Sequence, residues 1–279
     1  MKILSTIFAS ALFATVVSIG ASVYAQDDRP GFATIVRVQG IASYSLGDGN
    51  WHPLVAGKTL TAGSTIRSGE NGIVDVVLGK QIDFPQSEKA PDRITQAPDA
   101  PVRGLISSSP AASQNVVRLT PGTTLMIDKL TTVDSGADTV SDTELDLQQG
   151  KIFASVKKLS ATSQYLVKIP NGIAGVRGTE FSISADGATA VYDSKTGGLV
   201  LSLTVGGVTT TYVIAAGQFL DPATGGTAPI PPGIEGILSG IFTALKTTYH
   251  VTVNFDYNNN NCYISSLTGH LGGSAPPKF

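Results

Sequence analysis

Short runs in which apolar and polar residues alternate restrict the fold of this chain more than any other feature. The runs recur along its length, at residues 32–38, 74–78, 145–156, 165–169, 181–183 and 199–214. Alternation with a period of two gives a strand one apolar face, which is typical of half-buried antiparallel strands. Gly206-Gly207 separates two such runs and predicts a two-residue hairpin turn. We therefore expect an all-β fold, an antiparallel β-stack that is either a flattened sandwich or solenoid-like.

Composition narrows the classes of function. Of the 279 residues, 14% are charged and the formal net charge is -2, so nothing favours binding to nucleic acid or a polybasic membrane contact. The 31 glycines and 15 prolines favour turns and short elements over long helices. The single cysteine, Cys262, excludes a disulfide framework within the chain and a CxxC-type zinc site. We interpret it as a small core residue, with an intermolecular disulfide as the alternative.

The N-terminus carries the pattern of a secretory signal peptide. Lys2 precedes an apolar stretch from Ile3 to Ile19, and Val23-Tyr24-Ala25 is a small-residue cleavage pattern before an acidic break. We expect residues 1–25 to be removed, which places the mature chain in the periplasm or outside the cell without a transmembrane segment. The alternative is a retained anchor, because the apolar stretch is almost long enough to span a bilayer.

The remaining chain divides into a β-domain at residues 26–222 and, at residues 223–279, a linker, a short helix and C-terminal strands. Within the β-domain, the segment Pro85–Asn115 holds five prolines and a Ser-rich run, a composition that does not build a strand ladder. We interpret it as a long surface insertion that the fold can do without. Residues 250–257 and 262–267 are the expected C-terminal strands.

Six apolar residues after the linker follow a helical spacing. They are Ile234, Ile237, Leu238, Ile241, Phe242 and Leu245. This spacing fits one face of a short helix, although Gly236 and Gly240 weaken it by about 1 kcal/mol each relative to Ala. Because such a helix needs tertiary packing, we expect it to cap the open end of the β-stack. The alternative is that it binds a groove of a partner.

One segment carries a family resemblance. A strand and Pro170 lead into the sequence Gly175-Val176-Arg177-Gly178-Thr179, with Phe181 two positions later. This pattern resembles the G-V-R-G-T-x-F core of FecR-like domains, and weaker similarities lie at Gly57–Gly69 and Leu145–Val156. The resemblance covers roughly Ala33 to Leu220, with Pro85–Asn115 as an unmatched insertion.

The resemblance implies a FecR-like β-stack that lies outside the cytoplasmic membrane. Regulators of that family place an anti-sigma segment and a membrane helix before this domain, and we do not expect their sigma-relay role here because the signal sequence stands first. We expect instead an exported, non-enzymatic module that interacts with a protein or binds a ligand. Its partner is an unidentified protein or cell-envelope component, and no cofactor, metal or nucleic acid is expected.

The residues of the motif also have a structural interpretation. Gly175 and Gly178 permit a positive φ or a close approach of backbones, Thr179 can satisfy a turn amide, and Phe181 returns to the core. Arg177 can reach a carboxylate or carbonyl groups with its five donors. We expect these groups to fix it beneath the turn, so that Arg177→Ala costs about 2–4 kcal/mol. The alternative is that Arg177 binds a carboxylate or phosphate of a ligand.

Two further hypotheses rest on weaker signals. Trp51 and Tyr44 can stack on sugars, which gives a cell-wall or glycan-binding protein as the alternative function, although an anchor at a strand edge is the structural interpretation of Trp51. A hydrolase is the third hypothesis, with Glu144 and Asp146 as paired carboxylates. At a spacing of two on a strand, however, these residues indicate a solvated face, and the three histidines form no metal-binding motif.

Overall fold

The computed structural model describes residues 29–79, 103–108, 115–134, 139–194, 198–246, 249–256 and 261–269. The expected signal peptide lies outside these residues, as does most of the segment Pro85–Asn115. In the part of the chain that the structure describes, no helix combines the length and the hydropathy needed to cross a membrane.

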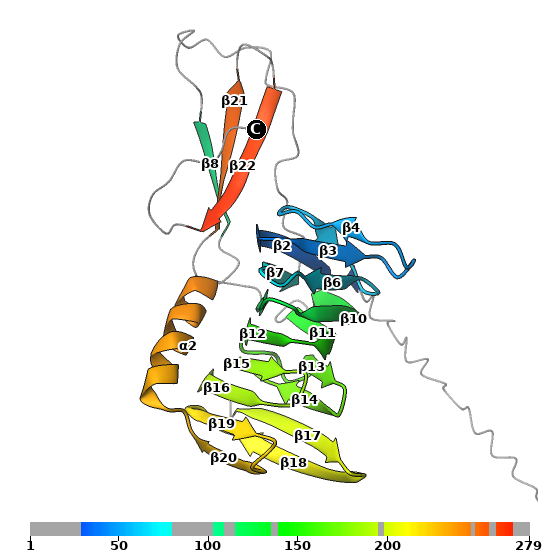
Figure 1. Ribbon diagram of the computed structural model, residues 1–279. Helices are drawn as coiled ribbons and strands as arrows, with labels where there is room; N and C mark the ends of the chain where they lie inside the picture. The colour runs from blue at the N-terminus through cyan, green and yellow to red at the C-terminus, as the bar shows by residue number, and fades with distance from the viewer. Residues whose placement is uncertain are drawn as a thin grey trace, which may run out of the picture.

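Two large sheets form the body of the molecule (Figure 1). The first sheet contains β1 (Arg29–Pro30), β3 (Ala42–Ser45), β4 (His52–Pro53), β6 (Thr65–Ser68), β10 (Thr124–Asp134), β11 (Thr139–Gln149), β13 (Gln164–Ile169), β14 (Gly172–Val176), β17 (Leu199–Val205) and β18 (Val208–Ile214). The second contains β2 (Phe32–Gln39), β5 (Thr59–Leu60), β7 (Ile73–Gly79), β9 (Asn115–Leu119), β12 (Lys151–Ser155), β15 (Thr179–Ser184), β16 (Thr189–Ser194), β19 (Gln218–Asp221) and β20 (Gly226–Pro229). The all-β prediction is confirmed.

The chain passes back and forth between the two sheets as it descends the stack in Figure 1. Strands of each sheet follow one another nearly in sequence order, from β4 to β18 in the first and from β5 to β20 in the second. This is the solenoid-like form of the expected stack. Among the described pairs, β11 and β13 are parallel, whereas their neighbours are antiparallel. The chain visits the second sheet as β12 between them, and a crossover of this kind brings a strand back in the same direction.

The main core lies between the two sheets and uses the apolar face that the alternation predicts. Leu145, Leu147, Val167, Phe181 and Leu201 are all fully buried there. The hairpin predicted at Gly206-Gly207 is confirmed, since Val205 pairs with Val208 and both glycines have a positive φ. A primed turn requires this conformation at both of its central residues.

Helix α2 (Pro232–Leu245) lies against the outer face of the second sheet, at the side of the stack (Figure 1). Its buried residues Leu238, Phe242 and Leu245 form a second core with Val36, Val77, Val116 and Phe153 from the strands. The helix itself is confirmed, but the prediction that it caps the open end is wrong. Several strands of the second sheet are apolar on both faces, so the outer face also needs a cover.

The segment Pro85–Asn115 does contribute strands, contrary to prediction. Strand β8 (Arg103–Ser108) pairs with β21 (Tyr249–Asp256), which pairs with β22 (Asn261–Gly269) to form a third sheet. The two C-terminal strands are therefore confirmed. Asn115 begins β9 and is buried, and its side-chain oxygen accepts a hydrogen bond from Lys157 N at 2.9 Å. Leu78 of β7 pairs with Asn115, so the chain leaves and re-enters the second sheet at adjacent points.

Candidate functional site

The motif from Gly175 to Thr179 crosses from one sheet to the other. Gly175 and Val176 end β14 in the first sheet, and Thr179 begins β15 in the second. Gly178 turns the chain between them with a φ of +60°, a conformation that favours glycine. The backbone at position 175 does not require glycine. Gly175 is an ordinary strand residue, and a Cβ there would meet no atom closer than 3.9 Å.

Arg177 lies in this crossing and is exposed. Its Nη2 donates to the carbonyl oxygen of Ala161 at 2.5 Å and lies 3.4 Å from that of Ser160. Backbone carbonyls therefore hold the guanidinium, as one form of the structural interpretation expects. We expected the guanidinium to lie beneath the Gly175–Gly178 turn, but the side chain is exposed and contacts the carbonyls of Ser160 and Ala161 instead.

The remaining motif residues serve the core and the sheet interface. Thr179 is buried and its hydroxyl donates to the carbonyls of Arg177 and Gly198, at 3.0 and 3.3 Å, so it satisfies acceptors and not the expected amide. Phe181 is 0% exposed, as predicted. Glu180, between these two residues, faces α2. Its Oε1 forms an ion pair with Lys246 Nζ at 2.7 Å, which links the C-terminal end of the helix to the second sheet.

A groove of about 670 Å³ opens beside Arg177. Its lining consists of the loop residues 161–163 together with Gln164, Tyr165, Leu166, Gly175, Val176, Arg177, Gly198 and Val200. The register aligns Leu166, Gly175 and Val200 in one row across β13, β14 and β17. Since Gly175 has no side chain, the row has a gap between two apolar residues, and all three residues of the row line the groove. Its volume falls in the range of about 300–1,000 Å³ that is typical of ligand sites.

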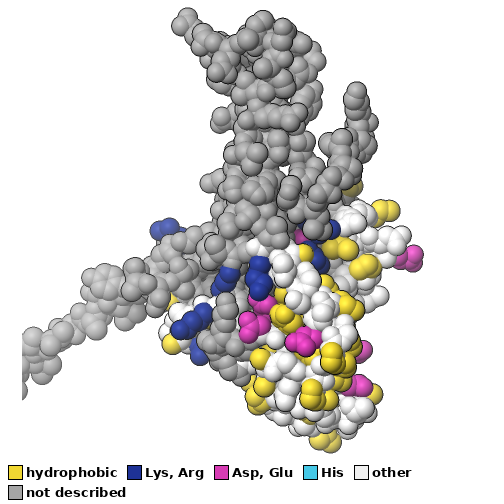
Figure 2. All heavy atoms as spheres, turned by 90° about the vertical axis from the view of Figure 1, so that its left-hand side faces the viewer, with side chains coloured by type: hydrophobic (Ala, Val, Ile, Leu, Met, Phe, Trp, Pro, Cys, Tyr) yellow, Lys and Arg dark blue, Asp and Glu magenta, His cyan; other side chains and the backbone are white. Residues whose placement is uncertain are grey.

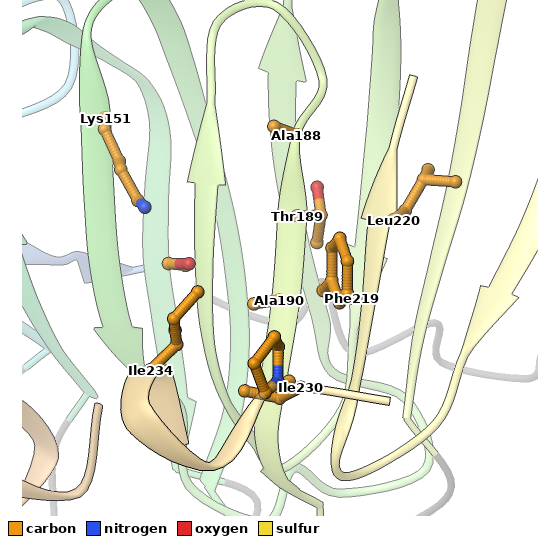
Figure 3. Close-up of a pocket in the computed structure, with 10 residues that line it drawn as sticks. Lys151, Ala188, Thr189, Ala190, Phe219, Leu220, Ile230 and Ile234 are labelled. Atoms are coloured by element: carbon orange, nitrogen blue, oxygen red, sulfur yellow. The ribbon is translucent and has the colours of Figure 1, made fainter. Parts of the chain in front are cut away.

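A second, smaller pocket of about 160 Å³ lies under the first turn of α2 (Figure 3). Lys151 extends from β12 on one side, Phe219 and Leu220 come from β19 on another, and Ile230 and Ile234 close it at the start of the helix. Burial lowers the pKa of Lys151, and the charge of Asp186 opposes this shift. Sequence reasoning did not find this pocket, because it exists only where the helix meets the sheet.

The two aromatic candidates lie at the opposite end of the stack from β18. Trp51 is 41% exposed, and the guanidinium of Arg67 lies over its ring at 4.1 Å. Tyr44 is half-buried; its ring lies 5.4 Å from that of His52, and Lys58 Nζ is 5.0 Å from its centre. Cations therefore already contact both rings. Whether Trp51 and Tyr44 contact a glycan stays a prediction.

The carboxylates proposed for a hydrolase lie on the outer face of β11. Glu144 contacts Lys168 Nζ at 2.8 Å, and that ammonium also lies 3.0 Å from Asp128. These two hydrogen-bonded carboxylates raise the pKa of Lys168. Asp146 accepts a hydrogen bond from Gln148. Within the described ranges no group of three His, Cys, Asp or Glu residues is placed to hold a metal ion.

Apolar side chains also reach the surface at the lower end of the stack. In Figure 2, which faces the α2 side, yellow side chains lie exposed in the lower part of the molecule. The exposed apolar residues of this end include Ile234 and Ile237 of α2 and Val205, Val208 and Val213 of the β17–β18 hairpin. The last three are 62%, 67% and 65% exposed.

Comparison with known families agrees with the motif. The family described as FecR protein matches residues 106–198, about a third of the chain, and this segment includes the crossing at Arg177. The resemblance is thereby confirmed over a shorter stretch than Ala33–Leu220, and the match starts inside the segment that was expected to be an unmatched insertion. No curated protein and no solved structure matches the chain. The molecule is therefore a two-sheet β-stack that contains a FecR-type segment.

Proposed function

We propose that this chain is an exported, non-enzymatic FecR-type module that binds another protein of the cell envelope through the groove beside Arg177. The observation that carries the proposal is the absence of a side chain at position 175, beside the groove. The backbone of Gly175 is that of an ordinary strand residue, and a Cβ there would meet no atom closer than 3.9 Å. Glycine therefore leaves the groove open, next to an exposed arginine of the same motif.

The lining of the groove suits a peptide segment. Leu166 and Val200 provide apolar walls, Gln164 offers an amide, and Arg177 offers a positive charge at the rim. An extended segment with one carboxylate and one apolar side chain complements this arrangement, because arginine recognises carboxylates with directed donors. The smaller pocket under α2 holds about 160 Å³ and has less room for such a segment.

Site-specific photo-crosslinking in the producing cells tests the groove. A photoreactive residue at Gln164, which is exposed on the groove, is expected to capture a discrete envelope protein. The same residue at Ile41, which is 81% exposed outside the groove, is the control and is expected not to capture it. Gly175→Val fills the gap between Leu166 and Val200 and suits a strand, so it should abolish the adduct while the melting temperature stays unchanged. Adducts that persist in Gly175→Val, or no adduct at Gln164, would contradict the proposal.

Export is the second part of the proposal, and the N-terminal sequence supports it. Cleavage after Ala25 gives a mature chain that begins at Gln26. Mass spectrometry of the protein recovered from the periplasm or the medium should show this N-terminus. An intact Met1 or Lys2 in the recovered protein would instead support a retained anchor.

A further inference from the structure

The four strands that end the two large sheets are not equally protected against pairing with another strand. Strands β4 and β5 have two residues each, and β4 contains Pro53. Strand β20 has four residues and ends in Pro229. Short edge strands and prolines are the usual devices against edge-to-edge association. Strand β18 has neither, since it runs for seven residues with the sequence VTTTYVI, which contains no charge and no proline.

The hairpin geometry shows which backbone groups of β18 face the free edge. In a two-residue hairpin the residues beside the turn, Val205 and Val208, exchange both hydrogen bonds. Alternate residues of β18 therefore bond to β17, and Thr209, Thr211 and Val213 direct their amide and carbonyl groups outward. The hydrogen bonds of β17 fit this alternation. Thr204, which lies opposite Thr209, directs its N–H away from β18 and donates it to the carbonyl of Asn171 at 2.7 Å.

We propose that β18 pairs with β18 of a second copy of this chain, antiparallel and centred on Thr211. In this register Thr211 meets its own counterpart, and Thr209 meets Val213. Each of the three outward-facing residues then exchanges both backbone hydrogen bonds with the residue opposite it in the partner strand, as the hydrogen-bonded pairs of an antiparallel sheet do. Paired residues also point to the same face, so each sheet continues across the two-fold axis without turning a side chain to the wrong side.

The side chains favour a second copy over a charged partner strand. Strand β18 carries no charge, so its self-pairing brings no like charges together. Val208 and Val213 are 67% and 65% exposed in the single chain, although valine is the type of residue that packs across strand pairs. Symmetric pairing places both residues beside residues of the partner strand and covers the open end of the first sheet.

Sedimentation of the purified exported protein over a range of concentrations tests the proposal. A dimer that dissociates on dilution is expected. Thr211→Lys places two ammonium groups together at the two-fold axis and should raise the dimer dissociation constant by at least about tenfold. Thr211→Val keeps the backbone and the β-branched shape and should leave the dimer intact. Thr227→Lys adds the same charge on exposed β20, at the same end of the stack, and is the matched control.

Amide hydrogen exchange supplies an independent readout. The peptide that covers β18 should exchange more slowly at concentrations where the dimer forms, and this protection should disappear in Thr211→Lys. A protein that stays monomeric at all concentrations would overturn the proposal. So would a dimer that Thr211→Lys does not weaken, because its interface would then lie elsewhere.

Discussion

One glycine, Gly150, makes the whole connection between two strands of this stack. Gly150 alone connects β11 in the first sheet to β12 in the second, with a φ of +83°. A Cβ at this position would lie 2.5 Å from Thr123 Oγ1 and 2.7 Å from Thr123 Cα. That threonine cannot move freely, since its hydroxyl donates to the carbonyl of Lys151 at 3.0 Å. Both the backbone conformation and the space therefore require glycine here.

Gly150→Ala should lower the free energy of unfolding by more than about 2 kcal/mol, because it adds a steric clash to the strain of a positive φ. Gly207→Ala is the matched control: Gly207 has a φ of +82°, but no atom lies within 4 Å of the place that a Cβ would take. Urea unfolding of both variants separates the two effects. Equal losses would show that the close approach to Thr123 contributes nothing.

Arg177 should contribute less to stability than its place in the motif suggests. The sequence led us to expect a loss of about 2–4 kcal/mol for Arg177→Ala, on the assumption of buried acceptors. Because Arg177 is exposed, water can reach the carbonyls of Ser160 and Ala161 when the side chain is removed. We now expect Arg177→Ala to cost below about 1 kcal/mol. A drop in thermal stability as large as that of Gly150→Ala would contradict this expectation.

Among the elements, α2 shows how a short helix is held by one face. Phe242 is 1% exposed, its ring stacks on Tyr192 at 5.4 Å, and it meets the edge of Phe153 at 6.2 Å. Glu180 fixes the C-terminal end of the helix through Lys246. Two apolar residues of the predicted face, Ile234 and Ile237, are 50% and 63% exposed. The spacing therefore identified the helix correctly but overstated the width of its buried face.

Phe242→Ala should cost about 3–5 kcal/mol if the helix unfolds together with the stack, since a buried aromatic ring is replaced by a cavity. Ile237→Ala should cost less than about 0.5 kcal/mol, because the side chain is already mostly in water. Urea unfolding followed by tyrosine fluorescence measures both changes. A small loss in Phe242→Ala would indicate that α2 detaches without affecting the sheets.

At the scale of the whole molecule, the stack and the third sheet depend differently on residues 80–114. Strands β7 and β9 form an antiparallel pair whose register brings Leu78 opposite Asn115. The chain between these strands therefore begins and ends at the same end of the β7–β9 pair. A short turn could connect the two strands there. The same chain supplies β8 to the third sheet.

Replacing residues 80–114 with a short Gly-Asn turn should leave the unfolding free energy of the stack within about 1 kcal/mol of the original. The same replacement removes β8, so amides of β21 should exchange faster with solvent. Hydrogen exchange resolved by peptide measures both parts in one experiment. A replacement that extends to Asn115 is the contrasting variant, and it should cost more because it removes the buried acceptor of Lys157 N.

The amino-acid sequence by itself determined the strands in which apolar and polar residues alternate, the hairpin at Gly206-Gly207, the existence of α2 and the FecR-type motif, but it did not reveal β8. These features follow from local periodicity and from backbone conformations that only glycine adopts easily, so they can be read from neighbouring residues. Tertiary structure alone decided that β11 and β13 run parallel, that α2 covers a sheet face, and that Gly175 lines a groove. Backbone hydrogen bonds between strands are the same for every sequence, so alternation shows which face of a strand is apolar but not which strand lies beside it.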